Sequence, residues 1–176
     1  MLIRSSRLSE IPVMQEIIAE ARGKMRAAGN FLQWTDGYPS EEVLRDDIAR
    51  GFSYVVEENG RPVATFVLAV CEEPTYRKIY GGQWLDDRLP YGTVHRIGSL
   101  EGVHGVLDEV LRWAFGQVGN IRIDTHRDNR VMRHLMEKHG FTYCGIIFLA
   151  NGDERLAYQK LRPDISGNPD RNVNRK

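Results

Sequence analysis

Two consecutive strand–helix–strand units in the second half of the chain constrain its fold more than any other feature of the sequence. Residues 93–99 alternate like a strand, residues 107–118 carry apolar side chains at helical spacing, and IRID at 121–124 alternates again. A second amphipathic helix then ends at Gly140, and FTYCGIIFLA follows as another strand. Because each crossover returns the chain to the same sheet, the pattern predicts an α/β (mixed α+β) fold with helices on both faces of a mixed sheet.

The first half of the chain supplies further strands and two helices. LIRSS at residues 2–6 is a short strand, and Ser9 stands where it can cap the first helix. A second, shorter helix opens at Ser40. Residues 52–70 form two β-rich runs around an Asn-Gly pair, which predicts a hairpin.

The complete order is strand, helix, helix, strand, strand, strand, helix, strand, helix, strand, strand. This order predicts a central mixed sheet of about seven strands flanked by about four helices, in a single domain over residues 1–161. The chain of 176 residues is long enough for a full hydrophobic core. Residues 162–176 are polar and without periodicity, so we expect a disordered tail there.

Composition argues against several classes of protein. Lys plus Arg and Asp plus Glu both number 24, so we expect no partnership with nucleic acid or an anionic membrane. No apolar run approaches the ~20 residues of a membrane span, and the N-terminal residues lack the apolar core of a signal peptide. With two cysteines and no metal-binding motif, the sequence predicts a cytoplasmic protein without a metal site.

Polar residues gather where two predicted strands meet helices. THRD at 125–128 follows IRID and Asn129 begins the next helix, while the turn GVHG at 102–105 precedes the other helix. Ligand sites of α/β proteins lie at such strand ends, and helix N-termini bind anions such as pyrophosphate. Each feature also has a simpler explanation, because GVHG can be a plain turn and Asn129 an ordinary N-cap.

Taken together, TVHRIGSLEGVHGVLDEVLRWAF, IRIDTHRDNRVMRHLMEKHGF and YCGIIFLANGDERLAYQK resemble the GNAT superfamily of N-acetyltransferases. The resemblance covers the order of elements over residues 1–160 and is most specific over residues 93–160. It implies acetyl-CoA as co-substrate, with a loop of the form R/Q-x-x-G-x-G/A binding the pyrophosphate through backbone amides. Here that loop aligns with residues 102–107, in which Gly105 is the central glycine but the basic residue and the last glycine are absent.

The resemblance also implies where the rest of the coenzyme binds. The pantetheine arm would lie between the strands at 93–99 and 120–125, pair with backbone near Ile97 and accept a hydrogen bond from Asn129. The expected coenzyme-binding residues are Ile97, Gly98, Gly102, Val103, His104, Gly105, Val106, Leu107, Asn129 and Met132. The tyrosine with which the family often protonates the leaving thiolate aligns with Met136, which we expect in the core because a thioether has no proton to give.

The implied reaction is direct attack by a primary amine in a ternary complex. An amine with a pKa of ~10.4 is almost entirely protonated at pH 7, so a base must take up a proton. His95 is the first candidate because it lies on the strand beside the acyl site, and His126 is the second; for each, a histidine without a catalytic role is the alternative. A backbone N–H near Ile97 is expected to stabilise the oxyanion.

The acceptor is expected to be a small-molecule or peptide amine. QWTDGYP at 33–39 resembles the acceptor loop of related acetyltransferases, so Gln33, Trp34 and Tyr38 are expected contacts, although its aromatic residues could equally cover the core. Tyr80 is a fourth expected contact.

Tyr80 stands in the irregular insertion at 71–92, a length typical of a functional or mobile loop. Its aromatic residues could form a lid or the contact of a homodimer. A non-catalytic acyl-CoA-binding or sensing module is the alternative function, favoured by Met136 and the altered glycine loop, and an acyl group other than acetyl stays open.

Overall fold

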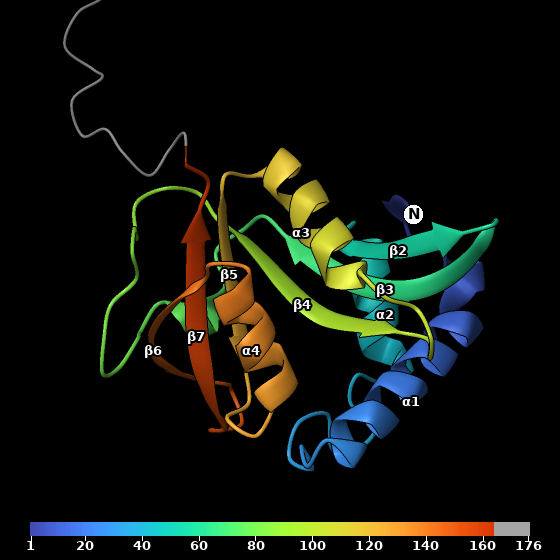
Figure 1. The fold of residues 1–176 in the computed structure, drawn as a ribbon, viewed down its shortest axis with the longest axis horizontal. Coiled ribbons are helices and arrows are strands. Elements are labelled where there is room, and N and C mark those ends of the chain that lie inside the picture. Colours follow the sequence, from blue (N-terminus) through green and yellow to red (C-terminus); the bar gives the residue numbers. More distant parts are fainter. Residues whose placement is uncertain (164–176) are drawn as a thin grey trace, which may run out of the picture.

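The structure is a computed structural model that describes residues 1–163, and its centre is a seven-stranded sheet with helices on both faces (Figure 1). The elements follow the order expected from the sequence, with two short 3-10 helices in addition. In chain order they are β1 (Leu2–Ser5), η1 (Leu8–Glu10), α1 (Ile11–Ala27), α2 (Glu41–Ala49), β2 (Ser53–Glu58), β3 (Arg61–Ala69), η2 (Pro74–Tyr76), β4 (Gly92–Ser99), α3 (Val106–Gln117), β5 (Asn120–Thr125), α4 (Arg130–Lys138), β6 (Thr142–Phe148) and β7 (Glu154–Leu161). The disorder expected for residues 162–176 falls, from residue 164 onward, outside the described residues.

The sheet is mixed and opens near its middle. The strand order is β1-β2-β3-β4-β5-β7-β6, and every neighbouring pair is antiparallel except β4 and β5. The parallel pair β4–β5 has only two partnered positions, Gly92 with Ile121 and Thr93 with Arg122. Beyond Thr93 the strands diverge, so the β5-facing edge of β4 has no β5 partner.

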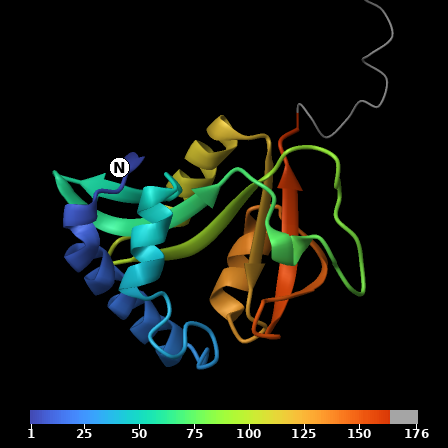
Figure 2. The same ribbon diagram turned by 180° about the vertical axis from the view of Figure 1, so that it is seen from behind.

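The helices form two layers, which Figures 1 and 2 show from opposite sides. Helices α1 and α2 cover β2, β3 and β4 on one face, and α3 and α4 lie on the other face. Val55 packs with Met14 of α1, whereas the next residue, Val56, belongs to the cluster that contains Met136 of α4. This division follows from the alternation of side chains along a strand. Met136 is fully buried, as expected.

The insertion between β3 and β4 packs on one face of the sheet, against β6 and β7. Tyr76 and Trp84 are buried and pack with residues of β6 and β7. Arg122 of β5 is 1% exposed, and its guanidinium lies 4.0 Å from the ring centres of both Trp84 and Tyr91. The expectation that these aromatic residues form a lid or a dimer contact is therefore wrong for Tyr76 and Trp84, because both rings complete the core.

The start of α1 also differs from the expectation. Ser9 does not cap the helix, because it lies inside η1, and α1 begins two residues later. The Glu10 carboxylate accepts the backbone N–H of Arg7 at 2.8 Å and pairs with Arg4 of β1 at 2.6 Å. A contact between separate elements thus displaces the local serine cap, and local spacing does not predict such a contact.

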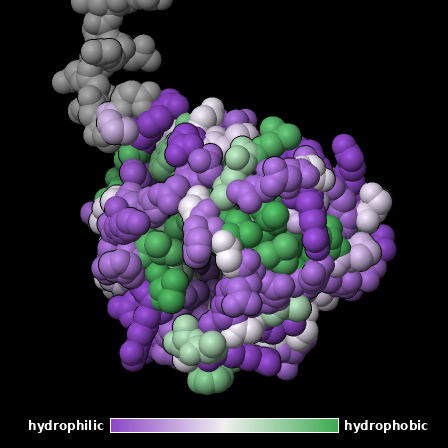
Figure 3. Space-filling view, turned by 45° about the vertical axis from the view of Figure 1, so that its right-hand side comes forward, coloured by the Kyte–Doolittle hydropathy of each residue, from purple (hydrophilic) through white to green (hydrophobic). Residues whose placement is uncertain are grey.

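The helices of the described residues do not meet the requirements of a membrane span. Among residues 1–163, no helix has both the length and the apolar character to cross a bilayer. The face of the molecule seen in Figure 3 is mostly hydrophilic, and the hydrophobic areas visible on it are separated by polar side chains.

Candidate functional site

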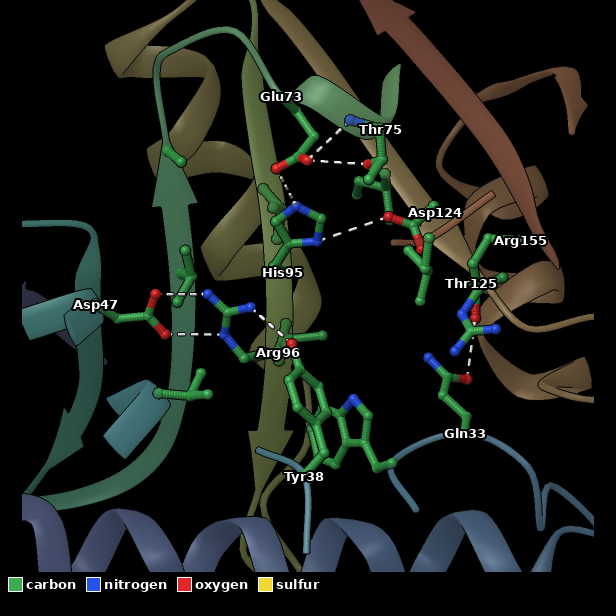
Figure 4. Close-up of a pocket in the computed structure, with 18 of the residues that line it drawn as sticks. Gln33, Tyr38, Asp47, Glu73, Thr75, His95, Arg96, Asp124, Thr125 and Arg155 are labelled. Carbon is green, nitrogen blue, oxygen red and sulfur yellow. Dashed lines mark hydrogen bonds and ion pairs between the residues drawn. The ribbon is translucent and has the colours of Figure 1, made fainter. Parts of the chain in front are cut away.

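A cavity of about 940 Å³ lies where β4 and β5 diverge. Its wall is formed by the loop between α1 and α2, by α2, by the beginning of the β3–β4 insertion, and by β4, β5 and the start of β7. Figure 4 shows the polar side chains that converge there. The cavity brings together predicted residues from distant parts of the sequence: Gln33, Trp34, Tyr38, His95, Ile97, Leu107, Asn129 and Met132.

His95 lies between two carboxylates in this cavity. Its Nε2 is 3.8 Å from the carboxylate of Glu73, and its Nδ1 is 3.7 Å from that of Asp124 (Figure 4). Both carboxylates are themselves fixed: Tyr76 donates to Asp124 at 2.7 Å, and the Thr75 hydroxyl and backbone N–H donate to Glu73 at 2.9 and 3.2 Å. The imidazole therefore faces the cavity with a negative charge on either side.

The charge states of the neighbouring groups follow from these contacts. The pKa of Glu73 is lowered to about 2, chiefly by the approach of His95 and also by the hydrogen bonds from Thr75, against the opposing effect of burial. Burial, together with Asp124, raises the pKa of Tyr76 well above its usual value. Tyr76 therefore stays protonated as a donor to Asp124, and Glu73 is ionised at neutral pH. Carboxylates this close to an imidazole stabilise its protonated form.

A bulge in β4 places His95 and Arg96 on the same cavity. The β3–β4 register shifts at this point, and Arg96 has a φ of 51°, in the left-handed region. Successive strand residues normally point to opposite faces, but bulges re-aim side chains. Arg96 donates to both oxygens of Asp47, at 2.6 and 2.9 Å, and to the Tyr38 hydroxyl at 2.8 Å. Burial raises the pKa of Asp47, and Arg96 opposes that rise. The Arg96–Asp47 pair was not predicted.

Asn129 acts as a cap and as a link to the acceptor loop. Its Oδ1 accepts the N–H of Met132 at 3.1 Å, and its Nδ2 donates to Gln33 Oε1 at 3.0 Å. The simpler explanation of Asn129, an N-cap, is thus confirmed. Only one Nδ2 hydrogen is left for the expected contact with the pantetheine arm.

The predicted pyrophosphate loop has the geometry of an anion site. Gly102 and Gly105 both have positive φ, 73° and 72°, and α3 starts directly after Gly105 without a side-chain cap. The N–H groups of an uncapped first turn are free to bind an anion. Val106 and Leu107 are buried in the core, so these two residues can contribute only backbone groups to a phosphate.

Tyr80 and Gly98, two of the predicted site residues, do not line the cavity. Tyr80 is not in the cavity wall, because its backbone pairs with Ile146 and its ring contacts Phe148 on the outer strand β6. Gly98 faces α1: a Cβ there would lie 3.0 Å from that of Ala21, so its role is close packing.

His126 also lies outside the cavity wall. Its Nδ1 accepts the N–H of Asp128 at 3.2 Å, and burial, with the cation of Arg155 nearby, lowers its pKa. Trp34 lines the cavity and is also part of the α1–α2 core, so the explanation of its ring as cover of the core is confirmed, and its contact with an acceptor stays a prediction.

The carboxylate partners of His95 were not predicted. The sequence does contain a pattern that could have indicated Asp124. Asn120, Arg122 and Asp124 alternate with isoleucines in a strand inside the sheet, so other groups must cover the polar face of that strand. Glu73 lies in the irregular insertion and had no local signal, because only the folded insertion brings it to His95.

Comparison with known proteins identifies the class of fold and then the family. A scan against protein-family models found no match, and a search of curated proteins found none either. Among solved structures, a GNAT-family acetyltransferase from Streptococcus agalactiae 2603 is 34% identical, with a TM-score of 0.82, over 92% of this chain and 95% of that chain. A structure described as an acetyltransferase from Staphylococcus aureus MU50 is 23% identical, with a TM-score of 0.68, over 92% of this chain and 99% of that chain.

A third solved structure, the NatC complex bound to Gag peptide and CoA, contains a chain that is 14% identical, with a TM-score of 0.55, over 91% of this chain and 97% of that one. At this identity the match shows the fold alone. The fold is that of GNAT acetyltransferases, and the extent of the Streptococcus agalactiae match shows more. The chain belongs to the GNAT family of N-acetyltransferases, and its activity is acetyl transfer.

Proposed function

We propose that the chain transfers the acetyl group of acetyl-CoA to a primary amine by direct attack, with His95 as the general base. The observation that carries this proposal is the placement of His95 between the carboxylates of Glu73 and Asp124, in a cavity next to the open edge of β4. An amine must lose a proton to form an amide, and a histidine held between two anions is suited to accept it.

The residues present fit the coenzyme that the fold family uses. The uncapped N-terminus of α3, after Gly105, offers backbone N–H groups to a pyrophosphate. The β4 edge from Val94 onward, free of β5, offers backbone groups to the pantetheine amides, and Ile97 and Met132 line the adjoining cavity. Coenzyme A is bound in the solved NatC complex, which shares this fold. When bound here, acetyl-CoA supplies the acyl thioester on which the amine acts.

The chain's own groups then account for the proton and for the charge on oxygen. His95 accepts the amine proton, directly or through a water molecule, and Glu73 and Asp124 stabilise the resulting imidazolium. A backbone N–H on the free β4 edge near Ile97 donates to the carbonyl oxygen as negative charge develops there. The C–N bond forms, the C–S bond breaks, and the thiol leaves as a thiolate, a tolerable leaving group because thiols have pKa values near ~8.5.

The second candidate base, His126, is less suited to this role. Its Nδ1 is engaged by the N–H of Asp128, and the side chain does not line the cavity. We therefore assign the base to His95 alone. Met136, at the place of the family's tyrosine, is fully buried, so the proposal includes no tyrosine acid.

The test is acetyl-CoA-dependent release of free thiol with a panel of primary amines. We expect amine-dependent release, with the acetylated amine identified by mass spectrometry. Binding of acetyl-CoA without thiol release for any amine would favour the alternative, a non-catalytic acyl-CoA-binding module. Comparison of acetyl-CoA with propionyl-CoA and succinyl-CoA in the same assay decides the acyl group.

A further inference from the structure

Arg155, near the start of β7, is a buried cation whose carboxylate neighbour lies beyond hydrogen-bond distance. Its side chain is 8% exposed and lines the cavity. The one hydrogen bond that this side chain makes within residues 1–163 goes to the carbonyl of Glu154 at 2.9 Å. The nearest carboxylate, that of Asp153, is 3.7 Å away, longer than a hydrogen bond. A guanidinium has five N–H donors, so Arg155 has donors left for a ligand.

Arg96, another arginine of the cavity wall, shows the contrast. Arg96 donates to both oxygens of Asp47 at 2.6 and 2.9 Å, so its charge is neutralised within the protein. Arg50, a third arginine of the cavity wall, is exposed and pairs with Asp46 at 3.6 Å, so it is not a buried cation. Arg155 is therefore the buried cation of this cavity that is least compensated.

Gln33 adds a second donor, and its orientation is determined by its neighbours. Because Asn129 Oδ1 accepts the N–H of Met132, Asn129 must present Nδ2 to Gln33. Gln33 must therefore accept this hydrogen bond with Oε1, which also accepts one from Asn30 Nδ2 at 2.9 Å. Its Nε2 is left without an acceptor among the described residues and points into the cavity (Figure 4).

The two donors lie close to the proposed amine site. Asp124, beside His95, pairs with Ala157 of β7, so Arg155 is its diagonal neighbour on the same face of the sheet. Such diagonal neighbours are about 7–8 Å apart. Gln33 Oε1 lies 3.5 Å from the hydroxyl of Thr125, the residue after Asp124. The cavity thus carries two carboxylates beside His95 and, on the neighbouring part of its wall, two side chains with unused donors, within reach of one small molecule.

We propose that the acceptor is an amino carboxylate, such as a free α-amino acid. Its amine binds beside His95, between Glu73 and Asp124, and its carboxylate accepts hydrogen bonds from Arg155 and Gln33 Nε2. A carboxylate matches this pair of donors because it is a planar monoanion, and a guanidinium with unused N–H donors can bind one negative charge. This inference rests on the proposed function, because it takes the amine to react beside His95.

The test compares amino acids with the amines that lack their carboxylate. The twenty amino acids are screened first, and kcat/KM is then measured for the best one, for its carboxamide and for its decarboxylated amine. We expect the amino acid to be preferred by about tenfold to a hundredfold, the range expected for a hydrogen bond to a charged group. Equal or better turnover of the decarboxylated amine would overturn the proposal.

Two variants test the residues. Arg155→Gln should bring the ratio of kcat/KM for amino acid over amine close to one, chiefly by raising KM for the amino acid. Gln33→Glu should lower the same ratio because it replaces the donor with an anion, and this variant decides the matter if Arg155→Gln does not fold. Arg127→Gln is the matched control, since Arg127 is exposed and pairs with Glu154 outside the cavity; its ratio should stay that of the wild type.

The outcomes separate this inference from the proposed function. A ratio that survives in folded Arg155→Gln and Gln33→Glu variants overturns the carboxylate site while leaving acetyl transfer to amines intact. Failure of every amine and every amino acid, despite bound acetyl-CoA, overturns the proposed function and this inference with it.

Discussion

At the scale of single residues, the site depends on His95 and on what surrounds it. The residue stands in a run of β-rich sequence and carries no unusual signal of its own. What distinguishes it in the structure is a carboxylate at 3.8 Å on one side and another at 3.7 Å on the other. The environment rather than the residue type supports the assignment, because ionisable groups that cluster around a histidine in a cavity are typical of functional sites.

Replacing His95 by glutamine should therefore remove the base and retain the shape. We expect kcat to fall by about 10²–10⁴-fold, the usual contribution of general-base catalysis. The dissociation constant of acetyl-CoA should change little, because the imidazole does not belong to the predicted coenzyme site. Steady-state kinetics and calorimetry measure the two quantities. His134→Gln, at an exposed position of α4, is the control, and full activity of the His95 variant would refute the assignment.

The pH dependence should reveal the role of Glu73. With its pKa lowered to about 2, Glu73 is ionised across the whole working range, so it does not produce an acid limb in that range. Protonation of Glu73 should therefore cause no loss of rate on the acid side of the wild-type profile. Over the same range Glu73→Gln should lower kcat, because the variant lacks the anion that contacts the imidazole. The control Glu72→Gln, an exposed carboxylate paired with Arg77, should keep the wild-type kcat. An unchanged kcat in Glu73→Gln would exclude a role for this charge.

At the scale of elements, the sequence predicts most of the fold because periodicity is a local property. All seven strands and all four α-helices were placed in the right order, and the opening between β4 and β5 was expected from the resemblance. The residues that cover β5 were not predicted, because the aromatic residues of an irregular insertion have no periodicity that would indicate burial in the core. Glu73 was not predicted for the same reason, because local spacing does not indicate which loop residues come into contact in the folded protein.

The packing of that insertion makes a stability prediction. Arg122 lies 4.0 Å from the ring centres of Trp84 and Tyr91 and donates to the Asp86 carbonyl at 2.8 Å. Arg122→Met keeps an unbranched chain but loses the charge, and a desolvated cation–π contact contributes about 2 kcal/mol. We expect a loss of about 2 kcal/mol in the free energy of unfolding, measured in urea. Arg112→Met, at an exposed position of α3, should cost much less; an equal cost would contradict this account.

The turn before α3 makes a prediction about the coenzyme. Gly105 has a φ of 72°, a conformation that asparagine and aspartate tolerate better than most residues. Gly105→Asp and Gly105→Asn therefore have nearly the same shape and strain but differ by one negative charge. If the N–H groups of α3 bind the pyrophosphate, the aspartate variant should bind acetyl-CoA about tenfold more weakly than the asparagine variant. Equal affinities in calorimetry would place the phosphates elsewhere.

At the scale of the whole molecule, the open sheet couples ligand binding to stability. The pair β4–β5 joins the two halves of the sheet through only two partnered positions, so the free β4 edge is the weakest part of the sheet. A ligand that pairs with this edge also bridges the two halves. The fold is then completed by its co-substrate, which is why binding should be visible as stabilisation of the entire domain.

Acetyl-CoA should accordingly raise the melting temperature. A ligand that binds only the folded state adds about 2.7 kcal/mol at a concentration of 100 times its Kd. For a domain of this size each kcal/mol corresponds to about 2–4 °C, so we expect a rise of about 5–10 °C. Differential scanning fluorimetry over a range of concentrations measures it, and pantetheine without the nucleotide should give a smaller shift because it lacks the pyrophosphate. An unmoved melting temperature at millimolar acetyl-CoA would contradict the coenzyme site, and with it the role assigned to the gap between β4 and β5.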